Sequence, residues 1–352
     1  MSVFKKQKMT RSIFELLNVD SKDDVDEGAV IEAAQQNPND IDRMFQFRHH
    51  RCCPLHKAIE LGLGTDAINP LISPVAIRNK ISYGMTPLHH ICGYKSASLE
   101  TLGVVLNAWP EAVRDKDAGG YTPLHSICGN RRASLEVLSA VLNAYPEAAR
   151  EKCNAGRTPL HEICVLKYCG NRGASLEMLS VVLKAYPEAA REKDNNGMTP
   201  LHLICWNRSG KDNNGCANKS ESLRIIQTIA YEWLKAKENR TSHSAISLIS
   251  KMEDEWGTDI RDDIKELFHH LSSLFEENNQ SNPSPPDIMT HFINTSWWNG
   301  VWLVVNRHPS IAKTMKLQTT LMTDFLFTAG KRLSLASMME VIKNEPDLLE
   351  GV

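Results

Sequence analysis

A tetrapeptide, Thr-Pro-Leu-His, recurs in this chain and constrains its fold more than any other feature. The copies begin at Thr86, Thr122, Thr158 and Thr199, so the spacings are 36, 36 and 41 residues. A proline precedes each threonine by 12 residues, and Ser-Leu-Glu follows in three of the units, at Ser98, Ser134 and Ser175. Markers that keep one order and nearly one spacing indicate an array of structural repeats, each packed on its neighbours.

One unit, residues 122–158, shows what each repeat can form. Thr122 is a suitable helix N-cap, and Pro123 suits the first helical turn, where its missing N–H is not needed. The residues that follow place one apolar stripe on a short helix, formed by Leu124, Ile127 and Cys128. Gly129 is expected to end this inner helix.

A second helix is expected to begin at Ser134, with Glu136 complementing its positive end. Its apolar face consists of Leu135, Leu138, Val141 and Leu142. Pro146 is expected to end it. Polar residues then lead to a glycine shortly before the next threonine, which predicts a projecting hairpin at 116–120, 153–156 and 194–197.

Two short helices, a hairpin and a Thr-Pro-Leu-His start to the inner helix resemble the ankyrin repeat. The units here are longer than the usual period of about 33 residues, and the extra residues lie between the two helices. The resemblance implies an all-α solenoid of helix-turn-helix repeats with short hairpin connections, followed by an additional C-terminal helical region.

The repeat pattern also suggests domain limits. We expect an N-terminal helical cap or partly disordered segment over residues 1–37, and the repeat array over 38–240, beginning with a decayed copy at Cys53-Pro54-Leu55-His56. Residues 241–300 predict an inserted helical segment, with one apolar face over 260–275 and a linker rich in Pro, Ser and Asn over 278–286. Residues 301–352 echo the second half of a repeat and predict degenerate capping repeats.

Composition excludes some classes of function. Forty basic and 42 acidic residues give a formal charge of −2, which offers no general attraction to nucleic acid. Neither a signal peptide nor an apolar run long enough to span a bilayer is evident. Nine cysteines, an odd number, suit a reducing compartment. The sequence therefore predicts a cytoplasmic or nuclear protein without a membrane or nucleic-acid partner.

The recurring histidines and cysteines are expected to be structural. Helices stacked about 8 to 10 Å apart place neighbouring imidazoles too far apart to share one ion. The tract from His49 to His56 contains zinc-ligand types, but no second pair follows at finger-like spacing. Gly62 is expected to end a helix rather than to cradle a phosphate. We expect no metal, no cofactor and no catalytic residues.

The surface is expected to determine the partner. The residue before each threonine and the residue after each histidine change from repeat to repeat, whereas the framework is constant. These candidate partner-binding residues are Met85, His90, Tyr121, Ser126, Arg157, Glu162, Met198 and Leu203. The sequence thus predicts a non-enzymatic scaffold that binds a protein through a concave face. The alternative is a regulatory or enzymatic module in residues 241–352, suggested by the Trp-rich segment 297–302, with the array delivering a target.

Overall fold

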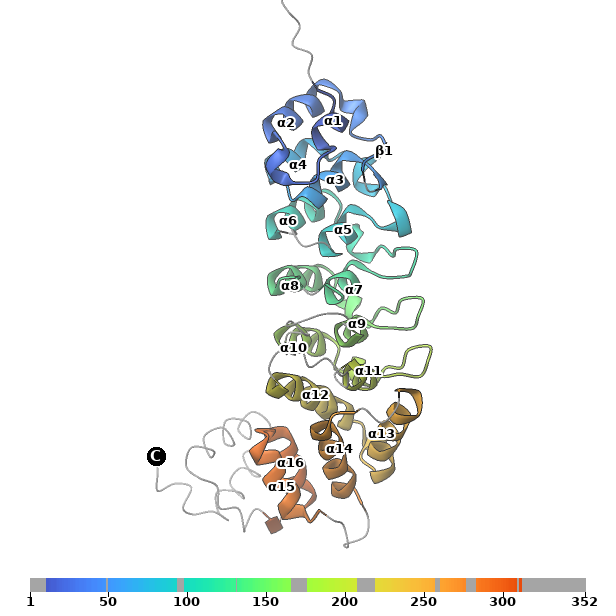
Figure 1. Ribbon diagram of the computed structural model, residues 1–352, viewed down its shortest axis with the longest axis vertical. Helices are drawn as coiled ribbons and strands as arrows, with labels where there is room; N and C mark the ends of the chain where they lie inside the picture. The colour runs from blue at the N-terminus through green and yellow to red at the C-terminus, as the bar shows by residue number, and fades with distance from the viewer. Residues whose placement is uncertain are drawn as a thin grey trace, which may run out of the picture. The chain divides into compact units, whose positions relative to one another are not determined.

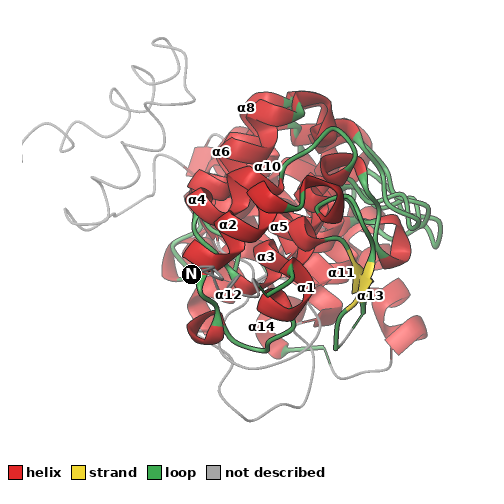
Figure 2. Cartoon of the chain, turned by 90° about the horizontal axis from the view of Figure 1, so that it is seen from above, coloured by secondary structure: helices red, strands yellow, loops and turns green. Residues whose placement is uncertain are grey.

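The computed structural model describes residues 11–48, 50–93, 98–130, 132–165, 176–207, 219–256, 260–276, 283–308 and 310–311. Helices make up almost all the regular structure of these residues, which confirms the predicted all-α class (Figures 1 and 2). The chain divides into a first unit, Met1–Tyr168 with Glu177–Thr199, and a second unit, Cys169–Leu176 with Pro200–Val352. None of the described helices is long and apolar enough to cross a bilayer.

The first unit begins with α1 (Ile13–Leu17) and α2 (Glu27–Gln36), whose buried side chains include Ile13, Leu17 and Val30. Two short antiparallel strands follow, β1 (Phe45–Gln46) and β2 (Arg51–Cys52), with Phe45 opposite Cys52. They are the yellow strands in Figure 2. Phe45 and Phe47 both pack on Phe14 of α1, so this hairpin belongs to the N-terminal core.

Pairs of helices then repeat along the first unit. The pairs are α3 (Pro54–Leu61) with α4 (Thr65–Ile68), α5 (Pro87–Gly93) with α6 (Leu99–Ala108), α7 (Pro123–Cys128) with α8 (Leu135–Ala144), and α9 (Pro159–Val165) with α10 (Leu176–Ala185). Within the first unit, α5, α7 and α9 form an inner row, α6, α8 and α10 form an outer row, and the hairpins project on the other side of the inner row (Figure 1). Residues 166–175, where the sequence places the longest insertion, lie outside the described part of the chain.

The expected helix limits are confirmed in the best-formed pair. Thr122 caps α7, Gly129 is its C-cap, and the Ser134 hydroxyl accepts a hydrogen bond of 3.2 Å from the Val137 N–H at the start of α8. A 3₁₀ helix over Pro146–Arg150 follows α8, and the sequence analysis did not predict it. Because proline fits the first turn of a helix, Pro146 both ends α8 and begins this short element.

The recurring histidines His89, His125 and His161 each tie one repeat to the next. His89 Nε2 lies 2.9 Å from the Tyr121 carbonyl oxygen, and His161 Nε2 lies 3.1 Å from that of Met198. The recurring cysteines are buried as expected, with Cys92, Cys128 and Cys164 at most 1% exposed. In the decayed first copy, Cys53 replaces the threonine, and its sulfur lies 3.0 Å from His56 Nδ1.

The projecting hairpins are also confirmed and are held to one another. Gly84, Gly120, Gly156 and Gly197 all have φ between 72° and 76°, the left-handed region that glycine enters without strain. The Asn154 side-chain N–H donates to the Ala118 carbonyl oxygen at 3.0 Å, and that of Asn195 donates to the Asn154 carbonyl oxygen at 2.9 Å. The hairpins therefore form one continuous row, seen from the side in Figure 1 and nearly superimposed in Figure 2.

Two further ladders repeat on the first unit. The guanidinium groups of Arg78, Arg114 and Arg150 lie over the rings of Trp109, Tyr145 and Tyr186, at 5.6, 5.0 and 5.1 Å from the ring centroids. The ammonium groups of Lys116 and Lys152 lie 2.7 Å from carboxylate oxygens of Glu151 and Glu192. Each such contact joins one repeat to the next, which is the nearest-neighbour organisation of a repeat protein.

The second unit contains α11 (Pro200–Asn207), α12 (Lys219–Leu234), α13 (Ser242–Trp256), α14 (Asp262–Leu274), α15 (Pro285–Asn294) and α16 (Trp298–Arg307). The apolar face predicted over 260–275 is confirmed, because Ile264, Leu267, Phe268 and Leu271 of α14 are fully buried. The linker predicted to extend to residue 286 ends earlier, since α15 begins at Pro285, where proline suits a first turn. The predicted capping repeats fall mostly on residues 312–352, which lie outside the described residues.

Candidate functional site

The structure separates the eight predicted partner-binding residues into two groups. Met85, Tyr121, Ser126, Arg157 and Glu162 are partly exposed. His90, Met198 and Leu203 are at most 3% exposed, so the expectation that they face solvent is wrong. Seven of the eight lie in the first unit, whereas Leu203 lies on α11 of the second unit.

His90 is buried beside two histidines that precede it in the chain. Its ring lies 5.7 Å from that of His56 and 6.3 Å from that of His50, measured between centroids. Burial, with the neighbouring histidines, lowers the pKa of His90 to about 3, so its imidazole is neutral at pH 7. The residue after the repeat histidine is therefore a core position in this repeat, although it is partly exposed in the next two, at Ser126 and Glu162.

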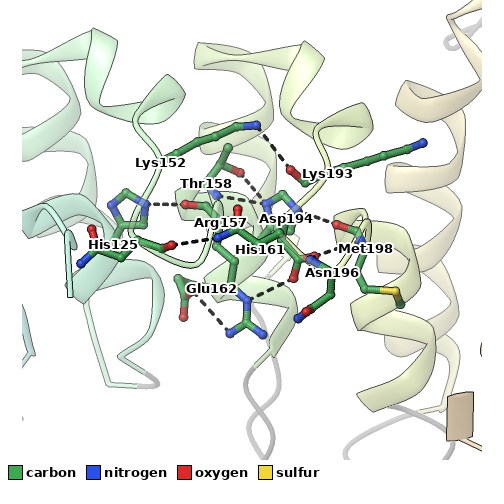
Figure 3. A network of polar contacts seen from close by, with 12 residues as sticks. His125, Lys152, Arg157, Thr158, His161, Glu162, Lys193, Asp194, Asn196 and Met198 are labelled. Carbon is green, nitrogen blue, oxygen red and sulfur yellow. Dashed lines mark hydrogen bonds and ion pairs between the residues drawn. The ribbon is translucent and has the colours of Figure 1, made fainter.

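Side chains of neighbouring repeats meet around the guanidinium group of Arg157, and among them only Asp194 is buried. Arg157 Nε lies 3.4 Å from Asp194 Oδ2, and Arg157 Nη1 lies 3.9 Å from Glu162 Oε1 (Figure 3). Tyr121, from the preceding hairpin, is close enough to this cluster for Glu162 and Arg157 to influence its pKa in opposite directions. We call Tyr121, Arg157, Glu162 and Asp194 the arginine network.

Asp194 was not among the predicted site residues. Its Oδ1 accepts hydrogen bonds from the Asn196 and Met198 N–H groups, both at 2.9 Å, and so it shapes the hairpin that carries it. Asp117 does the same in an earlier hairpin, where its Oδ1 accepts from the Gly119 and Tyr121 N–H groups at 2.8 and 2.9 Å. Asp117 and Asp194 occupy the same position in their repeats, and this recurrence could have indicated the role of Asp194 from the sequence. Cys153 occupies that position in the intervening hairpin.

The carboxyl group of Glu162 is incompletely satisfied. Its side chain is 12% exposed, and Oε1 has no hydrogen-bond partner, because 3.9 Å to the guanidinium is too long for a hydrogen bond. Burial raises the pKa of this carboxyl, and the nearby Arg157 opposes the rise. A buried polar atom without a partner is costly.

Tyr121 adds an aromatic surface beside this carboxyl. Its ring packs edge-on against His125 at 5.6 Å and lies over the backbone of Gly119, where a Cβ atom would approach the ring to 2.8 Å. Burial, together with the charges of Glu162 and Cys153, raises the pKa of Tyr121 to about 12, so the phenol remains a hydrogen-bond donor at pH 7. A phenol, a guanidinium and a carboxylate at one place suit recognition of polar groups.

Two regions of the second unit bear on the alternative of a regulatory or enzymatic module and on metal binding. Trp297 is 3% exposed and packs edge-on against Phe292 at 4.7 Å, so this member of the Trp-rich segment fills a core. In the second unit, Glu266 and His270 of α14 and His291 of α15 each place one potential metal-ligand atom within 4.8 Å of the other two. The sequence analysis did not identify this cluster, because His291 lies on a different helix from Glu266 and His270.

Comparisons with known proteins add no family assignment. The sequence matches no protein-family model and has no significant similarity to a curated protein.

Proposed function

We propose that this chain is an ankyrin-type repeat protein that binds a protein partner through the first unit and catalyses no reaction. The Thr-Pro-Leu-His starts, the paired helices and the glycine hairpins support the family. The same framework of buried histidines and glycine turns recurs from repeat to repeat, and it holds the partly exposed positions rigidly. Rigid presentation of varied side chains is how repeat proteins recognise partners.

The observation that carries the proposal is the unsatisfied Glu162 carboxyl within the arginine network. A lysine, an arginine or a backbone N–H of a partner would donate to the exposed part of this side chain, which is 12% exposed, while Tyr121 would pack against the same segment. Aromatic residues and arginines dominate the binding energy of protein interfaces, and both occur here. The binding site therefore centres on Tyr121, Arg157 and Glu162, with Met85 and Ser126 at its edge.

The chain carries cysteines that suit a reducing compartment. None of the seven cysteines among the described residues forms a disulfide, and all seven are buried. This supports a location in the cytosol or the nucleus, where thiols stay reduced.

Affinity capture with quantitative mass spectrometry tests the proposal. The full chain would be compared with the double variant Tyr121→Ala, Arg157→Ala and with a control, Asn143→Ala, Lys184→Ala, whose exposed residues lie on α8 and α10 of the outer row. We expect one or more proteins to be retained by the full chain and by the control, and to be lost from the double variant. Equal recovery by all three would contradict the assigned site.

A further inference from the structure

A histidine pair joins two helices of the second unit beside a carboxylate. His270 of α14 and His291 of α15 stack with ring centroids 4.1 Å apart and planes inclined by 13°. Glu266 lies one helical turn before His270, and its Oε1 is 3.2 Å from His291 Nδ1. One potential ligand atom from each of the three lies within 4.8 Å of the others.

Hydrogen bonds orient both imidazoles. His270 Nδ1 lies 2.7 Å from the Glu266 carbonyl oxygen, to which only a protonated nitrogen can donate. The lone pair of His270 is therefore on Nε2. A backbone carbonyl that fixes the tautomer in this way is the usual outer support of a metal-binding histidine.

His291 is held in a comparable way but keeps an unsatisfied atom. Its Nδ1 faces the Glu266 carboxylate, while its Nε2 is buried without a hydrogen-bond partner. The side chain of His291 is 13% exposed, whereas that of Glu266 is 56% exposed and can change rotamer. A buried imidazole nitrogen without a partner beside a second imidazole is a costly arrangement unless something binds there.

We propose that Glu266, His270 and His291 bind one divalent transition-metal ion, with zinc as the best match. Two imidazoles and one carboxylate form a ligand set that zinc accepts, at about 2.0 to 2.2 Å from each ligand atom. Tetrahedral ligands at that distance lie about 3.4 Å apart, so the three groups need to draw together by roughly 1 Å. A rotamer change of the exposed Glu266 side chain and a tilt of the His291 ring out of its stack on His270 supply this movement, while His270 keeps its hydrogen bond to the backbone.

Three protein ligands leave one coordination position open to water or to a donor from another molecule. The ion would also join α14 to α15 across the intervening segment and so stabilise the second unit.

Titration of the full chain with zinc alone, by calorimetry, tests the proposal. The variants are His291→Gln and Glu266→Gln, and the matched control is His269→Gln, an exposed histidine beside His270 on the same helix. We expect binding of one zinc ion by the full chain and by the control. Because outer-shell changes alone weaken metal binding by about 10- to 100-fold, loss of the direct ligand His291 should weaken it by at least about 100-fold.

Cobalt substitution identifies the ligands independently. Cobalt bound by imidazole and carboxylate has no thiolate charge-transfer band, whereas cobalt bound by the cysteines would show one. Circular dichroism without metal establishes that each variant is folded, and Glu266→Gln, at an exposed position, keeps the test valid if His291→Gln does not fold. The absence of zinc binding, a thiolate band, or equal affinity in Glu266→Gln and His269→Gln would overturn the proposal.

Discussion

His125 Nε2 lies 3.0 Å from the carbonyl oxygen of Arg157, 32 residues further along the chain. On the other side of the same ring, Nδ1 lies 3.2 Å from the Thr122 backbone nitrogen, from which it accepts a hydrogen bond. The two contacts together require the neutral imidazole with its proton on Nε2. His125 thus hydrogen-bonds both to the N-cap of its own helix and to the backbone of the next hairpin. It can make both hydrogen bonds only while its imidazole is uncharged.

This requirement predicts sensitivity to acid. Burial lowers the pKa of His125 and His161 to about 4, whereas a histidine in the unfolded chain has a pKa of about 6.5. The unfolded chain therefore binds more protons between these values, and stability decreases as the pH falls from about 6.5 to about 4. Each of the two should contribute a loss of about 3 kcal/mol over that window.

Urea denaturation measured at a series of pH values checks this expectation. The variant His125→Gln cannot take up the proton, so its free energy of unfolding should depend less steeply on pH, by up to about 1.4 kcal/mol per pH unit. An identical pH dependence in the variant and the natural chain would show that His125 is not linked to protons as proposed.

Packing between neighbouring repeats predicts a second effect. Leu138 is fully buried on α8, so Leu138→Ala should lower the free energy of unfolding by about 2 to 5 kcal/mol through lost contacts and the cavity that remains. Chemical denaturation followed by circular dichroism measures this difference. Asn143→Ala, an exposed change on the same helix, should change stability by less than about 0.5 kcal/mol.

The sequence predicted the features that depend on neighbouring residues. The cap at Thr122, the helix start at Ser134 and the glycine turns are local, because each involves atoms only a few residues apart. The buried position of His90 depends on His50 and His56, which a different part of the chain brings close. A pattern of residues close together in the sequence cannot predict a contact between residues so far apart in it.

The candidate sites could be predicted only in part, for the same reason. The variable positions identified Arg157 and Glu162, but the pairing of Arg157 with Asp194 depends on how far one hairpin lies from the next. The cluster of Glu266, His270 and His291 depends on how α15 packs against α14. The sequence of a repeat shows which of its positions vary. Which side chains come into contact depends on how the repeats and helices pack against one another.

The arginine network predicts a coupling between two residues. Arg157→Ala leaves the carboxylates of Glu162 and Asp194 without their cation, so it should lower the free energy of unfolding by about 1 to 3 kcal/mol. In a Glu162→Gln background one of those carboxylates is absent, and the same change should cost less, by about 0.5 kcal/mol or more. A double-mutant cycle in urea measures the difference. Strict additivity would show that the two side chains do not interact in solution.

Two glycines predict opposite effects of the same substitution. Gly120 has a φ of 76° at the tip of a hairpin, and a Cβ atom there would lie 2.8 Å from the Asn154 backbone nitrogen. Gly120→Ala therefore combines left-handed strain with a backbone clash and should lower stability by more than about 1 kcal/mol.

Gly103 lies within α6, and a Cβ atom there meets nothing within 4 Å. Gly103→Ala should raise stability by about 0.5 to 1 kcal/mol, because alanine is the better helix former. Thermal unfolding of both variants measures these effects. We expect a lower melting temperature for Gly120→Ala, because only this change disturbs the stacking of the hairpins. A higher melting temperature for Gly120→Ala would contradict the contact between neighbouring hairpins.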